Sequence, residues 1–151
     1  MTVPAFDRNG NLPPGIHKTT IGEIAARFAW NERRHRLWEG FRRAAANLAA
    51  AGVKKIWLGG SFVTSKDDPN DVDGCWDYMP SQLDTSKLDP VFLDTSPPRQ
   101  AMKRRYGVDL LISWRRLTDP EAHGTTVLEF FQKDQEGNAK GVLLLELVSD
   151  Q

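Results

Sequence analysis

The chain has 151 residues, 40% of them hydrophobic, with 20 basic and 20 acidic side chains and a formal net charge of zero. This length fits one domain, 1–151, and the balanced charge excludes a global field that attracts DNA or anionic membrane. The chain has one cysteine and no Cys/His spacing of the zinc type, so no internal disulfide or zinc site is expected. It has no apolar run of ~18 residues that could span a membrane, and a cytoplasmic protein is expected.

The N-terminal segment, 1–19, is predicted to be an arm with little regular structure. Asn9-Gly10 and the Pro-Pro-Gly run that follows are turn signals. After the arm, Thr20 and Glu23 have the spacing of a capping box, and apolar residues recur at helical spacing as far as Phe28. A short helix is therefore expected there.

A longer helix is expected from near Asn31, a favourable N-cap, to Gly52, which tolerates a left-handed helix end. One face carries an apolar stripe, and the remaining surface is crowded by five arginines: Arg33, Arg34, Arg36, Arg42 and Arg43. The simpler interpretation is a solvated face, partly neutralised by glutamates of the same helix. The alternative is a patch for phosphate or an acidic partner.

Three later segments have the pattern of strands: 53–58, 72–79 and 108–113. A polar connection, 80–98, and a short helix, 99–106, separate the last two. Two further strand-like runs, 125–132 and 141–148, flank a polar turn and predict a C-terminal β-hairpin over 125–148. The expected fold is α+β, with a mixed sheet, helices packed against it and this hairpin.

The segment 59–77, GGSFVTSKDDPNDVDGCWD, carries the most chemical information. A Gly-Gly-Ser turn after a strand lets backbone amides approach a phosphate, and a helix beginning at Ser61 would add its N-terminal amides. Ser61 also offers a hydroxyl. Lys66 lies in the loop that follows, where it serves either to bind phosphates or only to keep the loop soluble.

Two carboxylates, Asp71 and Asp73, alternate along the second strand and therefore share one face. Asp109 stands between apolar residues of a later strand, where a charge has to be paired or bound to a cation. Divalent metal would relieve the repulsion, and Mg²⁺ prefers such oxygens. The three aspartates are predicted to form one acidic triad, although Asp109 alone could instead pair with an arginine.

This pattern resembles the DNA-polymerase-β-like nucleotidyltransferase superfamily, particularly its minimal bacterial members, over about residues 31–113. The matching residues are Gly60 and Ser61 after a strand, the pair Asp71 and Asp73, and Asp109. The resemblance implies a nucleotidyltransferase-like fold in which Gly60 and Ser61 hold nucleotide phosphates. It also implies that the three carboxylates are catalytic and bind Mg²⁺ or Mn²⁺.

The resemblance also suggests a setting for the reaction. Minimal members of the superfamily often act on a partner protein or RNA in toxin-antitoxin or phage-defence pairs. The expected substrates are therefore a nucleoside triphosphate and a protein or RNA acceptor. The N-terminal arm and the C-terminal hairpin look like those of a small bacterial family of unassigned function.

One alternative keeps the fold and loses the catalysis. Gly74 and Cys75 replace the apolar residue usual after the second aspartate, so the strand is expected to bend or stop early. A protein of this kind would be a binding module, antitoxin-like or a scaffold, that uses the arginine-rich helix or the edge of the hairpin.

Other site types fit the same segment less well. A calcium loop requires acids at positions 69 and 80, which are Pro69 and Pro80, and no Gly-Lys-Ser/Thr triplet of a P-loop is present. Ser61, Asp109 and His123 occur in the order of an α/β-hydrolase triad, but the glycine that should close the nucleophile turn is Val63.

Overall fold

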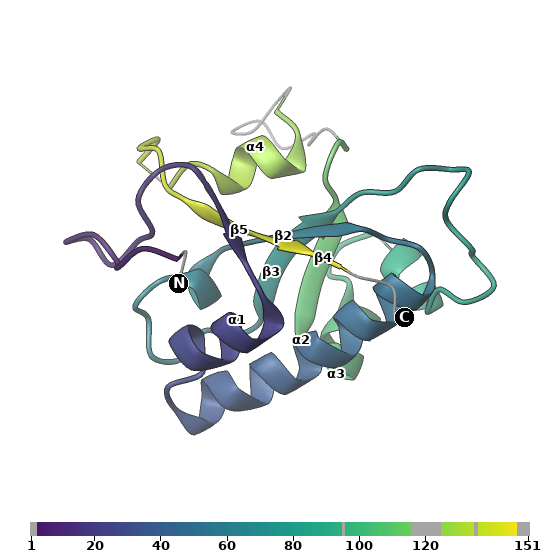
Figure 1. The fold of residues 1–151 in the computed structure, drawn as a ribbon, viewed down its shortest axis with the longest axis horizontal. Helices are drawn as coiled ribbons and strands as arrows, with labels where there is room; N and C mark the ends of the chain where they lie inside the picture. The colour runs from purple at the N-terminus through teal and green to yellow at the C-terminus, as the bar shows by residue number, and fades with distance from the viewer. Residues whose placement is uncertain (1–2, 95, 116–124, 135, 148–151) are drawn as a thin grey trace.

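A five-stranded mixed sheet forms the centre of the computed structural model, which describes residues 3–94, 96–115, 125–134 and 136–147 (Figure 1). The strands are β1 (Ile16–Thr19), β2 (Lys55–Gly59), β3 (Val72–Trp76), β4 (Val108–Ile112) and β5 (Val142–Glu146). Their order across the sheet is β1-β5-β2-β3-β4. The pairs β1–β5 and β3–β4 are parallel, whereas β2 is antiparallel to both β3 and β5.

Three helices cover one face of the sheet (Figure 1): α1 (Ile21–Phe28), α2 (Glu32–Ala50) and α3 (Gln100–Tyr106). The two predicted N-caps are confirmed, because Thr20 accepts a hydrogen bond from the Glu23 amide and Asn31 accepts one from the Arg34 amide. Apolar residues of these helices and of the sheet form the main core, and the expected mixed α+β architecture is confirmed.

A fourth helix, α4 (Val127–Phe131), lies on the opposite face of the sheet (Figure 1). It packs over a second, smaller apolar cluster that contains Trp57, Cys75, Val127, Val142 and Leu144. Burial raises the pKa of the Cys75 thiol to about 12, with Asp77 adding to the shift. Cys75 is therefore a small core side chain rather than a reactive thiolate.

The predicted C-terminal hairpin over 125–148 is wrong. Thr126 and Glu129 form a capping box that starts α4 in place of the first strand, and β5 pairs with β1 and β2 instead. One antiparallel bridge, between Lys133 and Ala139, remains around the polar turn. The hairpin pattern failed because apolar residues at 127–131 suit a short helix as well as a strand.

Two smaller predictions also need correction. The arm 1–19 is not irregular throughout, since its last four residues pair with β5 as strand β1. Gly74 does not interrupt β3, which continues to Trp76. A β-carbon at Gly74 would collide with the Trp57 carbonyl oxygen and contact the Leu58 and Leu110 side chains, so glycine allows neighbouring strands to pack closely there.

The helices predicted over 31–52 and 99–106 are confirmed as α2 and α3. Within the described ranges, no helix combines the length and the apolar character that crossing a membrane requires.

The close contact between α2 and α3 predicts the outcome of a substitution at Gly40. Alanine should favour the helix by ~1 kcal/mol, but its β-carbon would overlap the backbone carbonyl of Tyr106. We expect Gly40→Ala to lower the free energy of unfolding by ~1–3 kcal/mol, as overpacking does, measured by urea unfolding.

Gly22→Ala is the matched control, because Gly22 lies in α1 and a β-carbon there meets nothing within 4 Å. It should leave stability unchanged or raise it by up to ~1 kcal/mol. Equal effects at Gly22 and Gly40 would contradict the proposed α2–α3 contact.

Candidate active site

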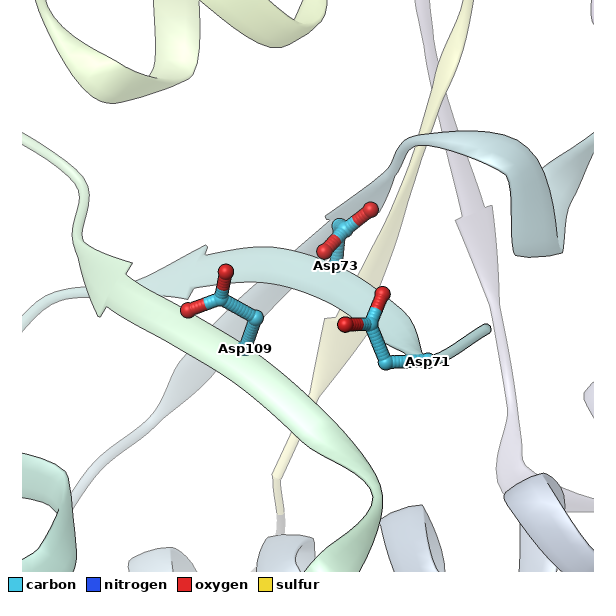
Figure 2. A group of neighbouring side chains, drawn as sticks. All are labelled: Asp71, Asp73 and Asp109. Carbon is cyan, nitrogen blue, oxygen red and sulfur yellow. The ribbon is translucent and has the colours of Figure 1, made fainter. Parts of the chain in front are cut away.

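The three predicted carboxylates lie together. Asp73 in β3 and Asp109 in β4 are direct partners in the register of the parallel pair, and Asp71 precedes Asp73 by two residues. One carboxylate oxygen from each residue lies within 4.8 Å of the other two, and Figure 2 shows the carboxyl groups facing a common space. The alternation of strand side chains places them on the α4 face of the sheet, the face of Cys75.

Within this acidic triad, Asp73 has a carboxyl with a strongly raised pKa. Burial raises the pKa of its carboxyl to about 8, and the charge of Asp71, a hydrogen bond with Asp71 and the charge of Asp109 add to the shift. Lys103 opposes it in part. Near neutral pH the site therefore holds a proton that a divalent cation would displace.

Asp109 is already paired with a cation. Arg99 donates from Nε to Oδ1 over 2.5 Å and from a terminal nitrogen to Oδ2 over 3.1 Å, and the Lys103 ammonium lies 3.9 Å from Oδ2. The predicted alternative, an arginine partner for Asp109, is confirmed together with its place in the triad. Each carboxylate oxygen keeps a second lone pair, so the ion pair does not prevent metal ligation.

The Gly-Ser turn lies directly beside Asp73. Gly59, the last residue of β2, is opposite Asp73 in the antiparallel register. Gly60 has a φ of 67°, and a β-carbon there would collide with the Asp73 carboxylate. Ser61 starts only a three-residue 3-10 turn, so no helix dipole acts there.

One buried arginine holds the loop that follows this turn. The guanidinium of Arg34 is fully buried and donates to the carbonyl oxygens of Phe62 (2.7 Å), Thr64 (2.7 Å) and Lys66 (2.6 Å). It also lies 3.7 Å from the centre of the Trp30 ring. Burial lowers its pKa to about 10, and the charge of Asp67 opposes that shift.

The arginines of α2 therefore do not form one solvated surface, as the sequence suggested. Arg33, next to Arg34, donates to the carbonyl oxygens of Pro69 and Asn70 and holds the end of the same loop. Arg36 and Arg42 remain partly exposed beside Glu32 and Glu39. The spacing of apolar residues in the sequence predicted which face of α2 is buried. It gave no indication that Arg34 turns inward.

A cavity of about 1300 Å³ opens next to the turn, and its lining includes Gly60, Ser61, Lys66 and Asp73. The lining also includes residues of α4 and of the segment that follows it, among them Phe130 and Lys140. Asp73 belongs both to the acidic triad and to the cavity lining, whereas Asp71 and Asp109 are not among the described lining residues. Four site residues predicted within 59–77 therefore line the same cavity: Gly60, Ser61, Lys66 and Asp73.

The hydrolase alternative gains no support from this geometry. Asp109, its proposed acid, is bound by Arg99 rather than by a histidine. His123 lies outside the described residues.

A model of a family of unknown function, DUF6932, matches residues 4–146. The chain belongs to this family. Searches of curated proteins and of solved structures found no match. The family match covers every residue of the acidic triad and of the described cavity lining, so the site lies within the family's common region.

The role of Arg34 predicts that lysine cannot replace it. A lysine offers no planar fork, so several buried carbonyl oxygens would lose their donors. We expect Arg34→Lys to lower the free energy of unfolding by ~2 kcal/mol or more, measured by urea unfolding.

Arg36→Lys, an exposed change on the same helix, is the matched control and should stay within ~0.5 kcal/mol of wild type. If both variants were equally stable, the Arg34 contacts would not be what holds the loop.

The raised pKa of Asp73 predicts how stability depends on pH in a chelator-treated protein. The folded state binds a proton that the unfolded chain releases above about pH 4, so wild-type stability should fall as the pH rises toward 8. Asp73→Asn removes this titration. Its advantage over wild type in free energy of unfolding should grow between pH 5 and pH 9 by more than ~1 kcal/mol.

Asp84→Asn provides a comparison, because hydrogen bonds from Ser86 lower the pKa of that exposed carboxyl below this pH range. Its difference from wild type should be constant from pH 5 to pH 9. A constant difference for Asp73→Asn as well would show that Asp73 is ionised at neutral pH.

Proposed function

We propose that this protein is a metal-dependent nucleotidyltransferase that moves a nucleotidyl group from a nucleoside triphosphate to a protein or RNA acceptor. The observation that carries the proposal is the position of Asp73. Its carboxylate belongs to a cluster of three, lies against the Gly60 turn, and lines a cavity large enough for a nucleotide. The carboxylates that would ligate the metal and the turn that would bind the phosphates are thus adjacent.

The donor set fits Mg²⁺ or Mn²⁺. Asp71, Asp73 and Asp109 offer only carboxylate oxygens, which are the ligands these hard cations prefer. Bound there, divalent metal would stabilise negative charge on the attacking and departing oxygens of a phosphoryl displacement. The acceptor hydroxyl oxygen would bond to the α-phosphorus as the bond to the β-phosphate breaks and pyrophosphate leaves, and Asp109 would accept the hydroxyl proton.

The phosphates would be bound by the turn and its loop. With its positive φ and no side chain, Gly60 allows a phosphate to approach the backbone closely, and the Ser61 hydroxyl is available as a donor. Lys66 lies in the same cavity lining and supplies a mobile ammonium. Arg34 would keep this loop in place through its carbonyl oxygens without touching the nucleotide.

A second candidate function is a binding module with the same fold and no catalysis. The bidentate Arg99–Asp109 ion pair favours it, because a permanent cation at Asp109 reduces the need for metal. Such a module would act through the exposed arginines of α2 or through the edge strands β1 and β4. The earlier idea of a free hairpin edge no longer applies, since β5 is paired on both sides.

The experiment incubates the full chain with Mg²⁺ or Mn²⁺, each α-labelled nucleoside triphosphate and a cell extract. Wild type should transfer label to a macromolecule, and the double variant Asp71→Asn plus Asp73→Asn should lose more than about 100-fold of this activity. Asp68→Asn, an exposed acid in the neighbouring loop, should keep it. Sensitivity of the labelled product to protease or ribonuclease identifies the acceptor.

No transfer by wild type, together with no metal-dependent nucleotide binding, would favour the binding module. Following the resemblance to minimal nucleotidyltransferases, we propose a toxin-antitoxin or phage-defence partner as the first acceptor to test.

A further inference from the structure

We infer that α4 and the segment after it complete the nucleotide site, with Phe130 stacking on the nucleobase and Lys140 binding the phosphates. Both residues line the cavity that also contains Asp73, Gly60 and Ser61. The inference rests on the proposed function, because it assigns the substrate of that site to a nucleoside triphosphate.

Phe130 is an apolar ring in the lining of a cavity whose other lining residues, apart from Phe131, are mostly polar. Half of its surface is exposed (50%), which is unusual for a phenylalanine on a short helix that has an apolar cluster to pack against. Its neighbour Phe131 takes the inward position and contacts Gly59, and the two rings meet edge to face with centroids 5.8 Å apart. Phe131 packs on the smaller apolar cluster and also reaches the cavity lining, whereas Phe130 keeps half of its surface exposed there.

The position of α4 is also constrained at its N-terminus. The Thr126 side chain accepts from the Glu129 amide, and the Glu129 carboxylate accepts from the Thr126 amide over 2.9 Å. A five-residue helix with this cap and with Phe131 against β2 is a rigid support. A rigid aromatic surface loses little entropy when a flat ligand stacks on it.

Lys140 lies close enough to Asp73 for their charges to interact, and both residues line the cavity. It is partly buried, and burial lowers its pKa while Asp134 and Asp73 oppose the shift. Its own amide donates to the Gln132 carbonyl over 2.9 Å, which fixes the backbone beneath the side chain. A partly desolvated ammonium gains more from a phosphate than an exposed one does.

Acidic side chains line the cavity as well, and the charges of Asp134 and Asp73 act on Lys140. The carboxylate of Asp134 accepts from the amides of Glu136 and Asn138, and Glu129 is occupied in the α4 cap. Lys66 and Lys133 line the same space. The described lining holds three lysines, four carboxylates and the Phe130 ring, and bound Mg²⁺ would offset the acidic charge so that a polyanion joined to a planar base can bind.

The volume is consistent with this ligand. Pockets for small molecules commonly enclose ~300–1,000 Å³, and this one reaches about 1300 Å³. This volume exceeds that range, so it would accommodate a nucleoside triphosphate and leave room for an acceptor group. A ligand with phosphates alone would leave the aromatic face unused.

The test compares Mg²⁺-nucleoside triphosphate with Mg²⁺-tripolyphosphate, using calorimetry on the full chain. Wild type should bind the best of the four nucleotides at least about fivefold more tightly than tripolyphosphate, as stacking on one aromatic ring provides. Phe130→Ala should abolish this difference without changing tripolyphosphate affinity, and Phe130→Trp should restore it. Lys140→Met should weaken both ligands by about the same factor.

Matched controls are Trp114→Ala, an exposed aromatic outside the described cavity lining, and Lys87→Met, an exposed lysine also outside it. Neither should change the affinity for either ligand. Urea unfolding midpoints of all variants should match wild type, which separates a binding effect from a folding effect.

Two results would overturn the inference: equal affinity of wild type for both ligands, or a nucleotide preference that survives in Phe130→Ala. The double variant Asp71→Asn plus Asp73→Asn separates this failure from that of the proposed function. If nucleotide binding by the double variant no longer depends on metal, and Phe130→Ala does not change nucleotide affinity, the proposed function stands and the inference fails. If nucleotide binding depends on Phe130 but never on metal or on these carboxylates, the inference stands and the proposed function fails.

Discussion

The pairing of β3 with β4 holds three carboxylates close together although their negative charges repel one another. Asp73 and Asp109 are register partners in a parallel strand pair, and Asp71 lies two residues before Asp73 on the same face. Arg99 balances the charge of Asp109, but Asp73 is left with a pKa of about 8. A folded protein retains such an arrangement at a cost in stability, which is typical of sites selected for function.

The rest of the molecule places a phosphate-compatible turn beside that charge. The antiparallel register brings Gly59 opposite Asp73, and Gly60 has room for the carboxylate only because it lacks a β-carbon. Arg34 holds the loop after this turn by donating hydrogen bonds to the carbonyl oxygens of Phe62, Thr64 and Lys66. Because five donors leave from one planar group, a single side chain orders a segment that has no regular structure.

The Arg99–Asp109 ion pair connects the two candidate functions. In a nucleotidyltransferase it would orient Asp109 and leave lone pairs for a metal ligand, and in a binding module it would replace the metal altogether. The fold is compatible with both, since a fold supports many activities and the site decides among them. Asp73 differs from Asp109 in having no cation bonded to it within the described residues, and it is the carboxylate that lines the cavity.

Local chemistry in the sequence was sufficient for several features. Thr20 and Asn31 specify helix starts through short-range hydrogen bonds, and the two-residue repeat of a strand places Asp71 and Asp73 on one face. Only the tertiary structure decided that Arg34 turns inward, that 127–131 is a helix, and that Phe130 remains exposed on a cavity. Arg34 turns inward toward carbonyl oxygens of residues 62–66, and β5 finds its partners in β1 and β2, so these outcomes depend on contacts between segments far apart in the chain. A local pattern carries no information about which distant partner a segment meets.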